Sequence, residues 1–266
     1  MKHLKKYNVN YSLTGKSTQP IILLLHGFTG DLQDFTPIIA LLSPSYYCLA
    51  VDLPGHGKTS IRGEETCYNM SNTALALIHL LDDLQIHKCL LLGYSMGGRL
   101  ALYMTLHFPD RFEKVVLESA SPGLKTQKER SHRLESDLQI AQKLENSNLQ
   151  EFLYYWYDRP LFQSLKKSPN FERLIETRLA NNPIELAKSL RNMGTGKQPS
   201  LWEKLAQNQI PLLLLAGEYD DKFQRINAEI ASLCPAAHNK IVSKAGHNIH
   251  FENIDEFVGA VRQFYD

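Results

Sequence analysis

Five short apolar runs constrain the fold of this chain more than any other feature. Each has the length of a strand, and segments with helical spacing of apolar residues separate them. The runs are IILLLHG at 21–27, YYCLAVDLPG at 46–55, KCLLLGYS at 88–95, KVVLESAS at 114–121 and IPLLLLAGE at 210–218. Continuous apolar strands that alternate with helices are typical of a parallel sheet buried on both faces. We therefore expect an α/β fold, with a mostly parallel central sheet and helices on both faces.

Polar residues gather at the carboxyl ends of these runs. They are His26–Phe28, Asp52, Ser95, Ser119–Ser121 and Glu218–Asp221. The carboxyl ends of parallel strands lie at one edge of a sheet, where the loops form the usual ligand crevice. We expect the functional site at this edge.

The segment between the fourth and fifth runs differs from the rest of the chain. Residues 123–208 are rich in Lys, Glu, Arg, Gln and Asn, show helical periodicity and contain no strand-like run. Ordinary crossover helices are an alternative interpretation, but the segment is longer than one crossover needs. We expect a helical cap at 123–208, inserted into a core domain made of residues 1–122 and 209–266.

Composition limits the kinds of partner. The 266-residue chain is 43% hydrophobic and 21% charged, which suits a soluble globular protein with one substantial core. Its formal net charge of +1 offers no general attraction for nucleic acid or an anionic membrane, so neither is expected as a partner. Any anion must then be bound by a few well-placed residues. The sequence leaves the oligomeric state open.

Cysteine usage and the lack of long apolar segments indicate the compartment. Cys48, Cys67, Cys89 and Cys234 form no C-x-x-C pair, so we interpret them as reduced core thiols rather than a zinc or dithiol site. The basic N-terminal stretch MKHLKKYNVNYSL lacks an apolar segment of signal-peptide length. No run approaches the ~18 residues that cross a bilayer. A cytoplasmic location is the expectation.

The pentapeptide GYSMG at 93–97 fits the G-x-S-x-G pattern. In a nucleophile elbow with this pattern, a strand turns sharply into a helix and the serine, here Ser95, occupies the strained apex. The apolar run before it and the helically spaced MGGRLALYMTLHF after it supply the required strand and helix. A glycine-rich turn without a catalytic role is the alternative. The context favours the elbow, in which side chains at 93 or 97 would collide with neighbouring segments.

An elbow serine needs an imidazole to accept its proton and a carboxylate to orient that imidazole. In this type of site the chain order is serine, then Asp or Glu, then histidine. After the last apolar run, AGEYDDKF offers Asp220 and Asp221, and SKAGHNIHFEN offers His247 and His250. We choose Asp220 because it lies nearer the strand end, and His247 because the Ala-Gly before it permits a tight loop. The predicted catalytic residues are Ser95, Asp220 and His247.

The same chemistry requires an oxyanion hole. It is made of the backbone N–H after the nucleophile and one N–H from the loop after an earlier strand, and Met96 and Phe28 occupy these positions. The glycine-rich HGFTGD suits close approach of the backbone to a ligand, although an ordinary strand-to-helix turn would also account for it. No motif calls for a metal or an organic cofactor, so none is expected.

Together these motifs resemble those of the α/β-hydrolase superfamily. They are HGFTG, DLPGHG, GYSMGG, GEYDDKF and AGHNIHFE, spread over nearly the whole chain. A narrower resemblance rests on GYSMGGRLAL, PGLKTQKERSHRLESD, WYDRPLF, RLANNP and GEYDDKF. These segments are similar to the 2-succinyl-6-hydroxy-2,4-cyclohexadiene-1-carboxylate synthases (SHCHC synthases) of menaquinone biosynthesis. The resemblance implies an α/β-hydrolase fold and a lyase.

Members of that family remove a ring proton from 2-succinyl-5-enolpyruvyl-6-hydroxy-3-cyclohexene-1-carboxylate and expel pyruvate. By position, the resemblance assigns the triad to the same three residues chosen above. It also implies substrate contacts at Arg99, Arg133, Arg178, Tyr94 and Trp156. Arg130, three residues before Arg133, is an alternative to it. The implied partner is a small-molecule polycarboxylate.

Three carboxylates on one substrate suit this set of arginines, because a guanidinium binds a carboxylate through two paired donors. Surface ion pairs are the alternative role for the cap arginines. A carboxylesterase, thioesterase or C–C bond hydrolase would use the same triad covalently, and a noncatalytic binding protein on this fold is a further alternative. The arginines favour the lyase over the hydrolases, and the complete triad disfavours the binding protein.

Overall fold

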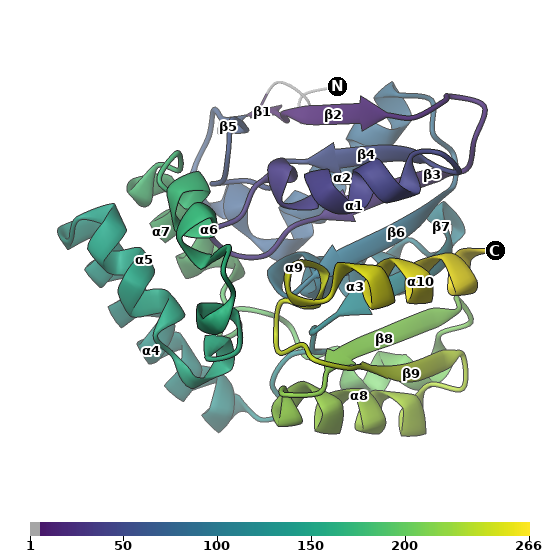
Figure 1. Cartoon of the computed structure of the whole chain (residues 1–266). Helices are drawn as coiled ribbons and strands as arrows, with labels where there is room; N and C mark the ends of the chain where they lie inside the picture. The colour runs from purple at the N-terminus through teal and green to yellow at the C-terminus, as the bar shows by residue number, and fades with distance from the viewer. Residues whose placement is uncertain (1–5) are drawn as a thin grey trace.

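A seven-stranded sheet forms the centre of the structure, a computed structural model that describes residues 6–266 (Figure 1). The strand order is β2-β4-β3-β6-β7-β8-β9, and only the pair β2 and β4 is antiparallel. The strands are β2 (Tyr11–Thr14), β3 (Ile21–Leu25), β4 (Tyr47–Val51), β6 (Cys89–Tyr94), β7 (Phe112–Glu118), β8 (Leu212–Gly217) and β9 (Ala237–Val242). A separate ladder pairs β1 (Tyr7–Asn8) with β5 (Ser60–Ile61). The first five residues of the basic N-terminal stretch lie outside the described residues.

Helices cover both faces of the sheet, which confirms the expected α/β class. Leu23 and Leu25 of β3 pack in one apolar core, and Ile22 and Leu24 pack in the other. Helices α2 (Met70–Asp83), α3 (Met96–His107) and α8 (Asp221–Leu233) contribute to the first core. Helices α1 (Thr36–Leu42) and α10 (Ile254–Tyr265) contribute to the second, and the short α9 (Ile249–Glu252) precedes α10. Because both faces of these strands are buried, their side chains are apolar on both faces and the sequence shows continuous apolar runs.

Between β7 and β8 the chain forms helices that gather beside one end of the sheet (Figure 1). They are α4 (Gln127–Asn146), α5 (Leu149–Tyr157), α6 (Phe171–Arg178) and α7 (Pro183–Met193). These helices share an apolar core of their own, which includes Leu144, Phe152 and Leu186. After α7 the chain returns to the first core of the sheet through Leu201 and Leu205. The separate core supports a helical cap, and its bounds at 123 and 208 stay a prediction.

The cysteines contribute to packing. Cys48, Cys67, Cys89 and Cys234 are free and buried. Desolvation raises the pKa of the Cys89 thiol to about 12, so it stays protonated at neutral pH. Within residues 6–266, no helix is both long and apolar enough to span a bilayer, and no three His, Cys, Asp or Glu side chains cluster as a metal site would require.

Candidate active site

Ser95 lies at the turn between β6 and α3, at the edge of the sheet where the parallel strands end. Its backbone has φ 48° and ψ −105°, a strained conformation for a residue other than glycine. The Ser95 N–H donates to the carbonyl oxygen of Glu118 at 2.8 Å and so ties the turn to β7. A Cβ at Gly97 would lie 2.6 Å from the carbonyl oxygen of His26. The turn can therefore pack this closely against the neighbouring strand only with glycine at position 97.

Two hydrogen bonds join Ser95, His247 and Asp220. Ser95 Oγ lies 3.0 Å from His247 Nε2, and His247 Nδ1 lies 2.8 Å from Asp220 Oδ2. Asp220 also accepts a hydrogen bond of 3.1 Å from the Phe223 N–H at the start of α8, which orients the carboxylate. His247 and Asp220 are almost fully buried, and hydrogen bonds in a low dielectric are electrostatically stronger than in water. The structure thus brings the three residues chosen from the sequence together.

The two alternative residues have other surroundings. Asp221 is exposed at the start of α8. His250 is buried, and its Nδ1 lies 2.7 Å from Glu118 Oε2. The backbone N–H of His250 donates to Glu118 Oε1 at 3.0 Å. Neither side chain forms a hydrogen bond with Ser95 or His247. The hydrogen-bonded chain at the elbow therefore consists of Ser95, His247 and Asp220.

Two residues of the cavity that contains Ser95 are candidates for the oxyanion hole, Phe28 and Met96. Phe28 follows β3 in the loop, and Met96 begins α3 directly after Ser95. Among the described residues, neither N–H donates to a protein acceptor. Both residues line the same cavity as Ser95. The ring of Phe28 lies 5.1 Å from that of Trp156, measured between centroids. These free N–H groups can donate to a ligand.

A cavity of about 660 Å³ lies above the elbow, between the sheet edge and the cap helices. Ser95, Asp220 and His247 line its floor, and Trp156 of α5 belongs to its wall. Five cationic side chains also line it: Arg99, Arg133, Arg159, Lys222 and Arg225. The acidic lining residues are Asp220 and Asp221, so positive charge predominates. Such a cleft attracts anionic ligands.

Known proteins share both the sequence and the architecture. The α/β hydrolase fold family matches residues 20–254. A Bacillus subtilis (strain 168) protein with the provisional name SHCHC synthase is 39% identical over 252 residues, which cover 94% of this chain and 92% of that protein. The SHCHC synthase of Enterobacter sp. (strain 638) is 32% identical over 90% of this chain and 89% of its own. This chain belongs to the SHCHC synthase family of α/β hydrolases. The structure of MenH from S. aureus is also similar, with a TM-score of 0.91 and 34% identity over 96% of this chain and 97% of that chain.

Two of the arginines that the family resemblance implies lie in the cavity. The Arg99 guanidinium donates to the carbonyl oxygen of Met193 at 2.9 Å and to Gln198 Oε1 at 3.1 Å. Burial, and then the charge of Arg133, lower the pKa of Arg99 to about 10, and the Asp137 carboxylate opposes this shift. Arg133 Nε donates to Asp137 Oδ1 at 2.7 Å. Each guanidinium has five N–H donors, so both have donors left for a ligand.

Arg178 and Tyr94 lie outside this cavity, which differs from the role that the family resemblance implies for them. Arg178 is 4% exposed and forms a two-point ion pair with Asp34, in which Nη2 and Oδ2 are 2.8 Å apart. It lines a different cavity, of about 410 Å³. The Tyr94 ring is buried against the rings of His247 and His250, at centroid distances of 5.6 and 4.9 Å. Burial by neighbouring groups keeps both side chains away from the Ser95 cavity.

Sequence reasoning missed three cations that line the cavity, Lys222, Arg225 and Arg159. The guanidinium carbon of Arg159 lies 4.3 Å from the centroid of the Trp156 ring, three positions earlier. The segment WYDRPLF carries the signal, because a cation three residues from a pocket tryptophan can stack on it. Arg130, the alternative to Arg133, is not among the lining residues and its guanidinium bonds to Gln127 at 2.9 Å.

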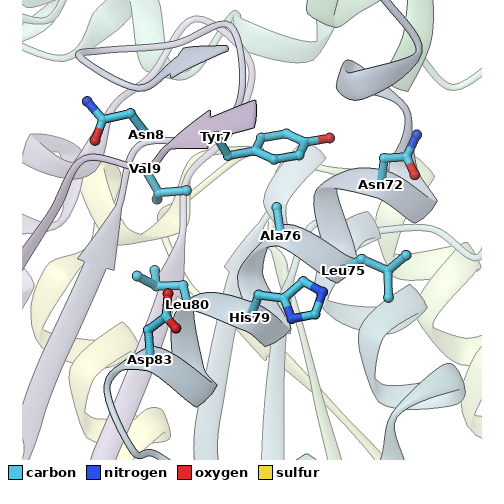
Figure 2. Close-up of a pocket in the computed structure, with 9 residues that line it drawn as sticks. All are labelled: Tyr7, Asn8, Val9, Asn72, Leu75, Ala76, His79, Leu80 and Asp83. Carbon is cyan, nitrogen blue, oxygen red and sulfur yellow. The ribbon is translucent and has the colours of Figure 1, made fainter. Parts of the chain in front are cut away.

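A further cavity, of about 240 Å³, lies between β1 and α2 (Figure 2). Tyr7, Leu75 and His79 are among the residues around it. No residue predicted for the site lines this cavity. The candidate active site is therefore the larger cavity at the elbow.

Proposed function

We propose that this protein is an SHCHC synthase, a lyase that eliminates pyruvate from 2-succinyl-5-enolpyruvyl-6-hydroxy-3-cyclohexene-1-carboxylate in menaquinone biosynthesis. The main support for this proposal is that Ser95, His247 and Asp220 are joined by hydrogen bonds in a cavity lined by five cationic side chains. A substrate with three carboxylates needs such charge, whereas a neutral ester does not. The relatives that carry this name support the same assignment.

In the proposed mechanism Ser95 is a general base. Asp220 holds the proton of His247 on Nδ1, which leaves Nε2 free to accept the proton of Ser95 Oγ. The Ser95 oxygen then removes a proton from a ring carbon of the substrate. The electron pair of that C–H bond moves into the ring, the second double bond forms, and the C–O bond to the enolpyruvyl group breaks. The leaving enolate takes up a proton and becomes pyruvate, and no bond forms between Ser95 and the substrate.

Negative charge that develops during this step needs donors. In this mechanism the N–H groups of Phe28 and Met96 stabilise it, and such a donor typically contributes about 3–4 kcal/mol to the transition state. Arg99 and Arg133 bind substrate carboxylates, and Trp156 packs against the apolar ring. Because guanidinium groups on rigid helices hold the substrate in place, the reacting carbon stays near Ser95 Oγ.

Pyruvate release from the synthetic enolpyruvyl substrate tests the proposal, with lactate dehydrogenase and NADH as the reporter. Ser95→Ala is expected to lower kcat by a factor of at least about 10³. Ser121→Ala is the matched control, because Ser121 lines the same cavity and has no assigned role. Rapid hydrolysis of p-nitrophenyl esters without any pyruvate release would instead identify a hydrolase that uses the triad covalently.

A further inference from the structure

The loop that carries Phe28 contains a strained residue. Thr29 has a φ of 69° and is 0% exposed. Left-handed backbone is costly for a β-branched residue, and such strain persists only where surrounding contacts hold the residue in place. Because Thr29 follows Phe28 directly, contacts that hold Thr29 also fix the backbone around the Phe28 N–H.

Two side chains beyond the core domain hold Thr29. The Tyr157 hydroxyl, at the end of α5, lies 2.9 Å from Thr29 Oγ1. Asn181 Nδ2 donates to the carbonyl oxygen of Thr29 at 2.9 Å. Asn181 Oδ1 also accepts a hydrogen bond of 2.9 Å from the Gly57 N–H, so it connects this loop with the loop after β4. The strained backbone is thus held from the cap side.

Arg178 and Asp34 add a charged contact to this arrangement. Both terminal nitrogens of Arg178 contact the Asp34 carboxylate, and Arg178 Nε lies 3.4 Å from the Tyr157 hydroxyl. Burial lowers the pKa of Arg178, but the charges of Asp34 and Tyr157 and the hydrogen bonds to both side chains together outweigh it, so the pKa lies above its usual value. Asp34 also packs against the loop itself, because a Cβ at Gly30 would collide with its carboxylate.

We infer that Arg178 is a positioning residue, which acts through Asp34 and Tyr157 to hold the loop 27–34 with the Phe28 N–H fixed beside Ser95. The inference rests on the proposed oxyanion role of Phe28. Direct contact between Arg178 and a substrate carboxylate is the alternative. Against it, the guanidinium is paired with a buried carboxylate and does not line the cavity that contains Ser95.

Two reactions distinguish these roles. The first is pyruvate release from the enolpyruvyl substrate. The second is inactivation by an uncharged p-nitrophenyl phosphonate diester, in which a bond forms between Ser95 Oγ and phosphorus and p-nitrophenolate leaves. The phosphonate carries no carboxylate, so its rate reports Ser95, His247 and the oxyanion donors without the arginines that bind substrate carboxylates. Variants at Arg178 and Tyr157 are compared with Arg99→Gln in the cavity. Arg191→Gln is a control, since Arg191 also forms a two-point ion pair, with Glu145, although that pair is more exposed.

A positioning role predicts that Arg178→Gln and Tyr157→Phe slow phosphonate inactivation and lower kcat for pyruvate release by about tenfold to a hundredfold, with KM changed by less than about threefold. Arg99→Gln raises KM and leaves phosphonate inactivation at the wild-type rate. Arg191→Gln changes neither reaction.

Arg178→Gln leaves the Asp34 charge buried and unpaired, which lowers the stability of the folded protein. The double variant Asp34→Asn/Arg178→Gln removes both charges, and its thermal unfolding is measured beside its kinetics. The inference is overturned if a folded double variant reacts with the phosphonate at the wild-type rate, or if Arg178→Gln changes KM alone. It is also overturned if the wild-type protein releases pyruvate but never reacts with the phosphonate. If the phosphonate pattern holds and no pyruvate is released, the proposed function fails and the positioning role stands.

Discussion

At the scale of single residues, the site depends on which of two adjacent carboxylates faces His247. Asp220 is 5% exposed, caps the start of α8 and lies 2.8 Å from His247 Nδ1. Asp221 is the first residue of the helix and is exposed. A shift of one position along the chain therefore separates a buried hydrogen-bond partner from a solvated carboxylate.

Asp220→Asn is expected to lower kcat for pyruvate release by a factor of about 10⁴, because an amide favours the wrong tautomer of the histidine. Asp221→Asn should change kcat by less than about threefold, as for other solvated side chains. Steady-state kinetics of both variants, each with a thermal unfolding curve, check the pair. If kcat fell strongly in Asp221→Asn and stayed near the wild-type value in Asp220→Asn, the acid would be assigned to the wrong residue.

Lys222 is expected to give substrate binding an alkaline limit. Desolvation and then the charge of Arg133 lower the pKa of Lys222 below its usual 10.5, although Asp220 opposes the shift. Above the lowered pKa the amine is neutral and no longer attracts substrate carboxylates, so KM should rise with pH while kcat changes little. Lys222→Arg should move this rise to higher pH, because a guanidinium keeps its charge.

Measurement of KM between neutral pH and about pH 10 tests this assignment, since free lysine titrates near the upper end of that range. Lys222→Gln should raise KM at neutral pH and reduce the rise to the part that Arg99, whose pKa is about 10, contributes near the upper end of the range. Persistence of the full rise in Lys222→Gln would assign it to another group.

The hydrogen-bonded grouping of Ser95, His247 and Asp220 could be predicted from the sequence, and the ion pair of Arg178 with Asp34 could not. Ser95, Asp220 and His247 each follow a recognisable strand or a glycine, so local pattern places them at one sheet edge. Arg178 is paired with Asp34, 144 positions away, through the packing of α6 on a loop of the core. No local pattern encodes that contact, because it depends on how two separate cores meet.

At the scale of elements, β6 and α3 meet without room for side chains. A Cβ at Gly97 would collide with the backbone of Leu25, the last residue of β3, and of His26, which follows it. Backbone atoms in a sheet cannot move aside as the end of a flexible side chain can. Gly259 in α10 is the opposite case, because a Cβ there would meet nothing within 4 Å.

Gly97→Ala is expected to lower the free energy of unfolding by about 1–3 kcal/mol through overpacking, and to reduce activity because the elbow shifts. Gly259→Ala should raise the free energy of unfolding by about 0.4–1 kcal/mol, since alanine restricts the unfolded chain and fits the helix. Urea denaturation of both variants measures these changes. Equal effects of the two substitutions would contradict the steric account of the elbow.

Buried strands were predictable and edge strands were not. The five apolar runs became β3, β4, β6, β7 and β8, because burial on both faces makes the whole strand apolar. β9 lies at the edge of the sheet and its sequence AHNKIV is mostly polar or exposed. β2 is the other edge and pairs antiparallel with β4. An edge strand with few buried side chains has no apolar run to reveal it.

At the scale of the whole molecule, the cavity takes its charges from both parts of the chain. Arg99 and Lys222 belong to helices that cover the sheet, whereas Arg133 and Arg159 come from the segment between β7 and β8. A substrate with several carboxylates can therefore contact the sheet side and the cap side together. Specificity for such a substrate is a property of the assembled chain rather than of the triad, since the same triad serves other reactions.

Arg159 is expected to bind one of these carboxylates. Within residues 6–266 its guanidinium has no carboxylate within ion-pair distance, and it stacks on Trp156 at the cavity wall. A charge-assisted hydrogen-bonded contact contributes about 1.5–3 kcal/mol, so Arg159→Gln should raise KM for the enolpyruvyl substrate by about tenfold to a hundredfold. Arg159→Lys should recover only part of the loss, because an ammonium lacks the planar paired donors.

Arg191→Gln separates a direct contact of Arg159 from a general effect of charge. It removes the same single positive charge from the same segment, but Arg191 is paired with Glu145 and does not line the cavity. If the field of the whole molecule attracted the substrate, both variants would raise KM alike, and added salt would reduce the difference from wild type because it screens distant charges over about 8–10 Å. If Arg159 binds the substrate directly, only its own substitution raises KM, and the ratio to Arg191→Gln persists at high salt, because contact inside a partly desolvated cavity is screened much less.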